Sequence, residues 1–267
     1  MEASRGPERV ALLGLGEAGS AFAADLVEAG VATMGWDPAP GRSVPGLTRA
    51  QSAVDAVAEA ELVLSLNSAS VAVAVARSAA PALSPGCLFA DLNTADVSVK
   101  REIAEVVSSA RAFFTDVALL SPVPGHGIRT PSLASGDGAE RYAATLRSFG
   151  ARVEVVGLEP GLAAGRKLLR SVFMKGLAAS VLESLNAAQA AGCADWLRTD
   201  IAQTLRDADE GLVDRLVDGS AEHAARRAVE MEAASDLLRE LGIEPHIADA
   251  ATEVLRDLRD ADRTAAG

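Results

Sequence analysis

The stretch Val10-Ala-Leu-Leu-Gly14-Leu-Gly16-Glu-Ala-Gly19 decides the fold class predicted for this chain. A short apolar run ends in glycines that fit the pattern G-x-G-x-x-G, and a segment of helical composition follows. In this context the first glycine permits a tight turn, the second lets a phosphate approach the backbone, and the third lets helix and strand pack closely. The stretch therefore predicts a strand, a phosphate-binding loop and a helix whose N-terminus faces the anion.

The predicted contacts to a dinucleotide come from this loop and the first helical turn. These residues are Gly14, Leu15, Gly16, Glu17, Ala18 and Gly19. Asp37 ends the second apolar run, about twenty residues further on, where an acidic residue typically binds the ribose hydroxyls. A carboxylate there favours NAD over NADP, although Arg42 follows closely enough to accommodate a 2′-phosphate. A turn role for Asp37, directly before Pro38, is the alternative.

Short apolar runs alternate with helical segments through the first half of the chain. The runs lie at 62–66, 87–90, 112–120 and 152–156, and the helical segments at 69–80, 97–110 and 139–149. This alternation is typical of βαβ units, which form a doubly wound parallel sheet of the Rossmann type with helices on both faces. Leu66 and Asn67, at the end of the third run, are further candidate cofactor contacts, because ligands bind outside the carboxyl ends of such strands.

The second half of the chain is expected to be helical throughout. No proline interrupts 161–191, so one long helix is predicted there, followed by helices at 195–217, 221–241 and 247–261. The change of pattern places a domain boundary after residue 158. We therefore expect an α/β protein with a dinucleotide-binding domain at 1–158 and an all-α domain at 159–267.

The composition is acidic and poor in aromatic residues. The 267 residues include 25 Lys and Arg against 37 Asp and Glu, a formal charge of −12. This balance argues against sequence-independent nucleic-acid binding, which depends on neutralising phosphates. No segment is apolar over the ~20 residues of a membrane span, and no signal-peptide pattern is seen. A cytoplasmic protein that binds neither nucleic acid nor membrane is expected.

No metal site is expected either. The three histidines are isolated, and the two cysteines, Cys87 and Cys193, lie far apart without ligand spacing. Burial in apolar surroundings is the predicted environment of both cysteines.

Four segments together resemble the β-hydroxyacid dehydrogenase family, which includes 3-hydroxyisobutyrate, tartronate semialdehyde and 6-phosphogluconate dehydrogenases. They are the glycine loop, Asp91-Leu-Asn-Thr94, the stretch 116–136, and Gly161-Leu-Ala-Ala-Gly-Arg-Lys167. The stretches 121–126 and 167–176 are similar to a bacterial subgroup of NAD(P)-dependent oxidoreductases of unknown substrate. The resemblance implies a Rossmann domain, a long interdomain helix, a helical domain for substrate binding and dimerisation, and a homodimer.

The resemblance assigns the catalytic lysine to Lys167 and places Asn93 near the nicotinamide. The chain departs from the family pattern at several positions of the pocket. Leu120 stands at the position of the substrate-binding serine (Ser121 replaces it only with a shift of one residue), Ala163 at a glycine, and Arg170 and Ser171 at two asparagines. No known member's substrate can therefore be transferred to this chain.

One face of the predicted long helix is cationic. It holds Lys167, Arg170, Ser171, Met174 and Lys175, which are spaced to lie on the same side. The opposite face is apolar and is expected to be buried, so the cationic stripe should face a cleft, a partner or water. A solvated basic face is the alternative.

We assign roles to this stripe from its chemistry. Next to a nicotinamide, Lys167 is the candidate acid/base, with Ser171 as a hydrogen-bonding partner. Arg170 and, less directly, Lys175 are candidate contacts to an anionic substrate, since Arg binds a carboxylate with two hydrogen bonds.

The remaining candidates lie on loops after strands. Asn93 is expected to orient the substrate or the nicotinamide amide, and a helix-cap or turn role is its alternative. Ser121 and His126 lie on a loop rich in Pro and Gly after the fifth run, where they are candidates for substrate binding. An exposed position on the surface is an equally good interpretation of His126.

The expected reaction is hydride transfer between a nicotinamide cofactor and a small anionic β-hydroxy acid, or its keto or semialdehyde form. Two alternatives remain open. Some relatives of this architecture reduce imines, although the lysine position there usually carries another residue. A nucleotide-binding sensor without catalysis is the second alternative, which the altered serine and asparagine positions favour.

Overall fold

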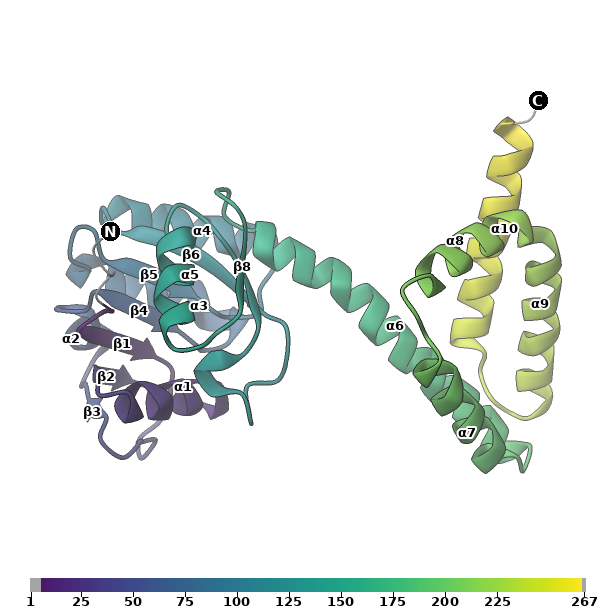
Figure 1. Cartoon of the computed structure of the whole chain (residues 1–267), viewed down its shortest axis with the longest axis horizontal. Coiled ribbons are helices and arrows are strands. Elements are labelled where there is room, and N and C mark those ends of the chain that lie inside the picture. Colours follow the sequence, from purple (N-terminus) through teal and green to yellow (C-terminus); the bar gives the residue numbers. More distant parts are fainter. Residues whose placement is uncertain (1–5, 266–267) are drawn as a thin grey trace. The chain divides into compact units, whose positions relative to one another are not determined.

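The computed structural model describes residues 6–265 and divides them into two compact units (Figure 1). The first unit ends at Arg170 and the second begins at Ser171. The division lies within the long helix α6 (Leu162–Ala190), which continues from one unit into the other.

An eight-stranded sheet forms the first unit, in the order β3-β2-β1-β4-β5-β6-β7-β8. Its strands are β1 (Arg9–Leu13), β2 (Ala32–Trp36), β3 (Thr48–Arg49), β4 (Leu62–Ser65), β5 (Leu88–Asp91), β6 (Phe113–Leu119), β7 (Ser132–Ser135) and β8 (Val153–Gly157). The chain leaves β1 for β2 on one side and reaches β4 on the other, so the strand order reverses at β1. This arrangement confirms the predicted α/β class and its doubly wound sheet. Ligands of such sheets bind at the point where the strand order reverses.

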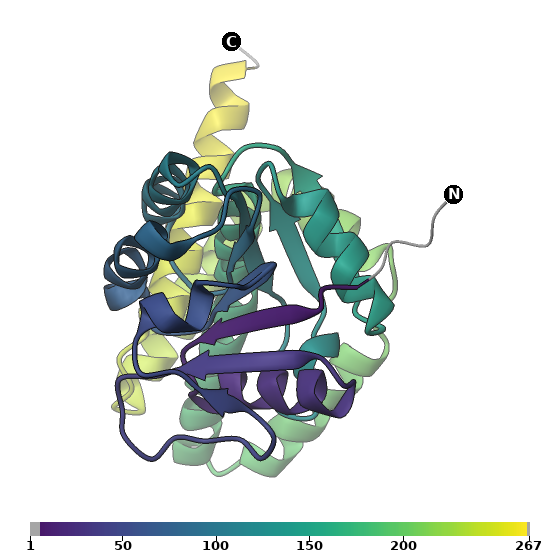
Figure 2. The ribbon, with the colours of Figure 1, turned by 90° about the vertical axis from the view of Figure 1, so that its left-hand side faces the viewer.

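Helices cover both faces of the sheet, as Figure 2 shows. One layer consists of α1 (Glu17–Glu28) and α5 (Ala139–Ser148), and the other of α2 (Ala53–Val57), α3 (Ala69–Ala79) and α4 (Val97–Ser109). Successive side chains of β1 point to opposite faces. Val10 and Leu12 therefore belong to the core beneath α1 and α5, whereas Ala11 and Leu13 belong to the core beneath the other layer.

Two short strands and one short α-helix of the first unit were not predicted. β3 and α2 lie in the segment 37–61, and β7 lies in the segment 121–138. β7 pairs antiparallel with β6, so the sheet is not entirely parallel as predicted. The reason is the connection: the loop 120–131 contains only the 3-10 turn Gly127–Arg129, whereas a parallel neighbour is usually reached through an α-helical crossover.

The described residues of the second unit form helices and no strand, as predicted. After α6 it contains α7 (Ala194–Arg206), α8 (Leu212–Glu222), α9 (Ala224–Glu240) and α10 (His246–Ala265). The prediction of one helix over 195–217 is wrong, because α7 ends at Arg206 and α8 begins at Leu212, with a non-helical segment between them. Arg215 donates a hydrogen bond to Asp209 of this acidic segment at 2.8 Å, and Gly211 caps α8.

Glu183 of α6 fixes the start of α10 within this unit. Its two carboxylate oxygens accept the backbone N–H groups of Ile247 and Ala248 at 2.8 and 3.0 Å. A carboxylate at a helix N-terminus satisfies free donors and opposes the helix dipole.

The apolar side of α6 is exposed, contrary to the prediction that it is buried. Leu169 and Val172 are 74% and 75% exposed, and Phe173 is 64% exposed. Ala163 and Ala164 at the start of α6 are buried, whereas these three side chains belong to none of the apolar clusters formed by the described residues.

Two further predictions concern cysteines and membranes. Cys87 is buried, and burial raises its pKa to about 11, but Cys193 is exposed, which corrects its predicted burial. Cys193 precedes α7 at a helix boundary rather than on an apolar face. Across residues 6–265, none of the helices combines the length and apolar character needed to cross a bilayer.

Candidate cofactor and active site

Two glycines of the 14–19 loop lie directly against neighbouring backbone, as the sequence pattern implied. Gly14 has φ +108°, and a Cβ there would lie 2.2 Å from the backbone oxygen of Leu66. A Cβ on Gly19 would lie 2.0 Å from the backbone oxygen of Gly14. Both distances are far shorter than any van der Waals contact, so β1, the loop and α1 pack together only with glycine at these two positions.

Gly16 differs from Gly14 and Gly19 because no backbone atom comes close to the position that a Cβ would take. A Cβ there would first meet Nη1 of the flexible Arg42 side chain, at 3.2 Å. Gly16 also caps α1 without any side-chain hydrogen bond to the first turn. Leu15 is buried beside this turn, Glu17 is exposed and Ala18 is half-buried. An uncapped helix start next to a bare glycine fits the phosphates of a dinucleotide.

Asp37 is buried beside this loop at the end of β2. Its Oδ2 accepts the N–H of Leu15 at 2.7 Å, and its Oδ1 accepts the N–H of Ala39 at 2.8 Å. Arg42 Nη1 lies 3.4 Å from Oδ2. The carboxylate thus ties the glycine loop to the turn after β2, and one guanidinium neighbours both Asp37 and Gly16.

Leu66 and Asn67 follow β4, next to the glycine loop. Gly14 packs against the backbone of Leu66, and the side chain of Leu66 is buried. The side-chain amide nitrogen of Asn67 donates to Ser65 Oγ at 3.0 Å. Among the described residues no donor reaches the buried Asn67 Oδ1, which is an unpaired acceptor beside the glycine loop.

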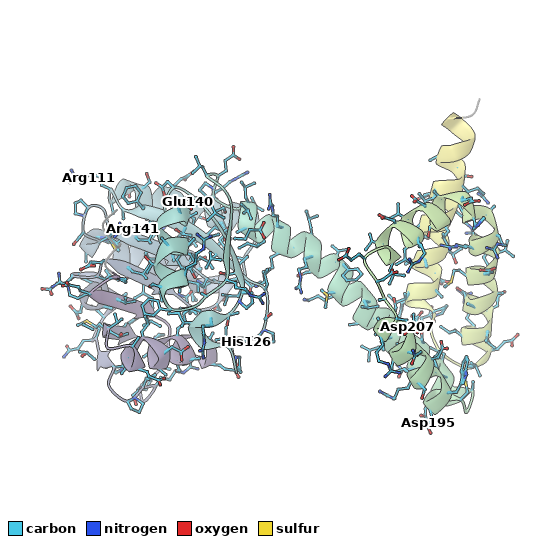
Figure 3. The ribbon with its side chains drawn as sticks, viewed as in Figure 1. Arg111, His126, Glu140, Arg141, Asp195 and Asp207 are labelled. Carbon is cyan, nitrogen blue, oxygen red and sulfur yellow. The ribbon has the colours of Figure 1, made fainter. Side chains whose placement is uncertain are left out.

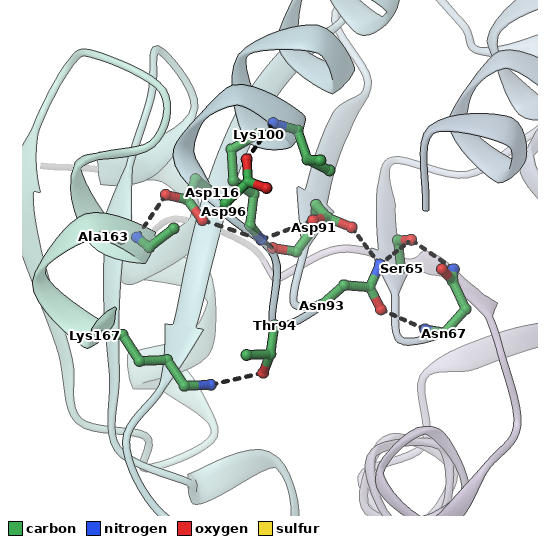
Figure 4. A network of polar contacts seen from close by, with 12 residues as sticks. Ser65, Asn67, Asp91, Asn93, Thr94, Asp96, Lys100, Asp116, Ala163 and Lys167 are labelled. Atoms are coloured by element: carbon green, nitrogen blue, oxygen red, sulfur yellow. Dashed lines mark hydrogen bonds and ion pairs between the residues drawn. The ribbon is translucent and has the colours of Figure 1, made fainter. Parts of the chain in front are cut away.

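Asn93 is buried after β5, and its side chain is fully engaged (Figure 4). Its Oδ1 accepts the N–H of Asn67 at 2.6 Å, and its Nδ2 donates to Asp91 Oδ1 and Ser65 Oγ at 2.5 and 3.2 Å. The alternative of a helix cap is wrong, because Asp96 caps α4 with bonds to Ser98 and Val99. Asn93 therefore joins the ends of β4 and β5.

Lys167 lies one turn into α6 and reaches the loop that carries Asn93. Its Nζ donates a hydrogen bond to Thr94 Oγ1 at 2.9 Å, although the two residues are far apart in the chain (Figure 4). The side chain of Thr94 is exposed, whereas Asn93 beside it is buried. An amine and a hydroxyl thus meet at the carboxyl end of the parallel strands, where open α/β sheets bind their ligands.

The other residues of the cationic stripe continue along α6. Arg170 ends the first unit and is exposed. Ser171 is half-buried and Lys175 exposed, and both belong to the second unit. All three follow Lys167 on one helical face, as their spacing predicted.

Ser121 and His126 lie on the loop between β6 and β7. Ser121 is half-buried, and His126 is exposed near the lower edge of the first unit in Figure 3. Asp25 of α1 holds this loop by accepting the N–H of Ile128 at 2.7 Å. Leu120 instead packs with Ala118, Leu133 and Ala163, so the position at which the family has a serine is part of an apolar contact under α6.

Sequence reasoning missed a charged cluster beneath these residues. Lys100 of α4 lies between Asp91 and Asp116, and all three side chains are buried. Burial raises the pKa of Asp91, and the charge and hydrogen bond of Lys100 oppose that rise. The signal was present in the sequence: Lys100, Ile103 and Val107 share the buried face of α4, and a lysine at such a position requires an acidic partner.

Comparisons with known proteins agree with this geometry. Residues 9–157 match the model of the NAD binding domain of 6-phosphogluconate dehydrogenase, and residues 188–258 match a domain of unknown function. A probable 3-hydroxyisobutyrate dehydrogenase from Mycobacterium bovis is 33% identical over 132 residues, which cover 48% of this chain and 45% of that protein. The chain thus aligns with about half the length of this curated relative.

Solved structures extend the likeness to nearly the whole chain. A conserved hypothetical protein from Sinorhizobium meliloti 1021 is 29% identical, with a TM-score of 0.64 and coverage of 95% of this chain and 89% of its own. An imine reductase from Myxococcus stipitatus (V8 variant, in complex with NAD+) shares the fold, with a TM-score of 0.82, 21% identity, and coverage of 96% and 95%. With more than half of its residues matched by the 6-phosphogluconate dehydrogenase NAD-binding domain, the chain belongs to the β-hydroxyacid dehydrogenase family.

Proposed function

We propose that this protein is an NAD(P)-dependent dehydrogenase that interconverts a small anionic β-hydroxy acid and its keto or semialdehyde form. The observation that carries the proposal is the contact between Lys167 and Thr94 at the carboxyl end of the sheet. It places an ionisable amine beside the loop that follows β5, within the same unit as the open glycine loop.

The chain's own residues bind the reactants and manage the proton. A bound nicotinamide supplies or accepts the hydride. Lys167 donates a proton to the substrate oxygen during reduction, and takes it back during oxidation. Thr94 holds the amine in place, and Asn93, whose side chain is fully engaged, acts by fixing the backbone of this loop. Gly16, Asp37 and Asn67 hold the dinucleotide.

The charge of α6 supports an anionic substrate. Arg170 and Lys175 follow Lys167 on the same face, and both side chains are exposed. A guanidinium binds a carboxylate with two hydrogen bonds, which also fixes the orientation of the substrate. Ser171 on this face, and Ser121 or His126 on the loop after β6, are further candidates for substrate contacts.

The proposal is tested in two steps with the purified full chain. Nicotinamide fluorescence is first titrated with NADH and NADPH, and turnover is then measured on matched panels of hydroxy acids, aldehydes and cyclic imines. Turnover of an anionic hydroxy acid supports the proposal. Turnover confined to imines would identify an imine reductase, and binding without turnover on any panel would favour a nucleotide sensor; either result overturns it.

Asp37→Ala should weaken NADH binding by about tenfold or more, because the variant removes a charged hydrogen-bond acceptor for the ribose hydroxyls. The same change removes the charge that repels a 2′-phosphate and leaves Arg42 without its 3.4 Å partner. We therefore expect the ratio of NADPH to NADH affinity to rise. Parallel fluorescence titrations of both nucleotides measure this ratio.

Arg42→Ala is the matched control, because it removes the cation and keeps the carboxylate. NADPH binding should weaken in this variant while NADH binding is retained. Thermal unfolding of both variants separates a loss of binding from a folding defect. Such a defect is expected if Asp37→Ala loosens the loop, because Asp37 also accepts the N–H of Leu15. Unchanged NADH affinity in a folded Asp37→Ala protein would show that Asp37 serves only the turn.

We also propose that the protein is a homodimer. The support is the exposed apolar surface of α6 and of the helical unit, where Trp196 and Val213 are 66% and 65% exposed. Exposed apolar patches of this kind usually mark an interface. Light scattering coupled to size-exclusion chromatography measures the mass directly, and a monomer at micromolar concentration would contradict the proposal.

A further inference from the structure

Lys100 is a buried cation for which the proposed reaction has no direct use. It is 1% exposed on α4, between Asp91 and Asp116, which are both fully buried. Removing a lysine and two carboxylates from water is expensive, and such groups are retained only with close partners. The cost points to a function that an apolar residue at this position would not serve.

The ammonium group of Lys100 donates two hydrogen bonds to Asp91 and forms an ion pair with Asp116. Nζ lies 2.9 Å from the backbone oxygen of Asp91, 2.7 Å from Asp91 Oδ2 and 3.1 Å from Asp116 Oδ1. Asp91 ends β5, and Asp116 is its direct partner in register on β6. Lys100 therefore clamps the carboxyl end of β5 to the middle of β6.

From this clamp, one set of hydrogen bonds leads toward the cofactor side. Asp91 Oδ1 accepts from Asn93 Nδ2 at 2.5 Å, and Asn93 Oδ1 accepts the N–H of Asn67 at 2.6 Å. Asn67 is the residue whose buried Oδ1 lacks a partner among the described residues. These bonds fix the loop that ends at Thr94.

A second set leads to the helix that carries Lys167. Asp116 Oδ2 accepts the N–H of Ala164 at 2.9 Å and the hydroxyl of Ser135 at 3.3 Å, and Ser135 Oγ accepts the N–H of Ala163 at 3.1 Å. These are free donors of the first turn of α6, so a buried carboxylate caps this helix. The two sets meet at Lys100 (Figure 4).

We propose that Lys100 is a positioning residue, which fixes the start of α6 against the 91–94 loop and so keeps Lys167 beside Thr94. This inference rests on the proposed role of Lys167. Lys100 does not touch the reactants; it acts through Asp91 and Asp116. Its charge compensates one of the two adjacent carboxylates, and the N-terminus of α6 stabilises the other.

The test compares two variants with a matched control. Lys100→Met removes the cation alone and leaves two buried carboxylates together, which endangers folding. The double variant Asp91→Asn, Lys100→Met also removes the uncompensated charge and keeps Asp116 as the cap of α6. Arg101→Met changes an exposed cation on the same helix and serves as the control.

The first measurement needs neither cofactor nor substrate. The rate at which an amine-acylating reagent modifies Lys167 is followed by peptide mass spectrometry in the ligand-free full chain. Loss of the Thr94 contact should raise this rate by about fivefold in the folded double variant. The control should match the wild-type rate.

The second measurement is turnover on the substrate found in the panel. In the double variant kcat should fall by about a hundredfold, because a small misplacement of an acid/base has effects of this order, while KM and NADH affinity are retained. Wild-type values of both the labelling rate and kcat in a folded double variant would overturn the positioning role and leave the proposed function intact. If the wild-type protein turns over nothing, the proposed function fails, and the labelling rate still decides whether Lys100 positions Lys167.

Discussion

Lys167→Ala should lower kcat by about 10²- to 10⁴-fold, the contribution expected of a positioned general acid/base. Cofactor affinity should not change, because the residues proposed to hold the dinucleotide lie on the loops after β1, β2 and β4. Steady-state kinetics on the substrate from the panel give kcat and KM, and nicotinamide fluorescence gives the affinity. A drop in kcat without a drop in binding separates proton transfer from assembly of the site.

Arg166→Ala is the control for this change. Arg166 neighbours Lys167 on α6, is exposed, and lies 3.5 Å from Glu154 in a surface ion pair. Its loss should leave kcat near the wild-type value, since exposed ion pairs contribute little. Equal kinetics for Lys167→Ala and wild type would remove the acid/base assignment, and with it the observation that supports a dehydrogenase.

The glycine loop shows which parts of the structure can be predicted from sequence. Three glycines at fixed spacing define a backbone path, and the distances at Gly14 and Gly19 show why other residues are excluded. The long helix α6 was equally predictable, because helical composition without a proline over many residues leaves few alternatives. Local rules decide such elements, so local sequence is sufficient.

Elements that depend on distant pairing were missed. β7, Ser132–Ser135, has no strong apolar signal, and it is a strand because its backbone pairs with β6 and β8. β3 is only two residues long and is defined by its pairing with β2. Tertiary context overrides propensity for such short segments.

The candidate site was predictable residue by residue, but its connections were not. The family resemblance indicated Lys167 and Asn93, whereas the hydrogen bond of Lys167 to Thr94 joins segments far apart in the sequence. Lys100 was missed because a lysine within a helix is usually read as exposed. Whether the predicted roles of these residues hold, and whether the boundary at 158 marks a functional division, stay predictions.

Gly14→Ala should destabilise the first unit by about 3 kcal/mol, which combines backbone strain with overpacking. The reason is twofold: φ at Gly14 is +108°, and the added Cβ would lie 2.2 Å from the backbone oxygen of Leu66. Relief requires movement of the loop away from β4, which displaces Gly16 and Leu15, so NADH binding should be lost as well. Denaturant unfolding monitored at Trp36 of β2, in a Trp196→Phe background, reports on this unit alone.

Gly30→Ala provides the matched comparison, because it separates strain from contact. Gly30 also has a positive φ, +77°, but a Cβ there meets no atom within 4 Å. This variant should lower the free energy of unfolding only by the cost of the left-handed backbone, about 1 kcal/mol. It should bind NADH as the wild type does. If Gly14→Ala and Gly30→Ala were equally stable and bound NADH equally well, the close approach of the loop to β4 would not be what selects glycine at position 14.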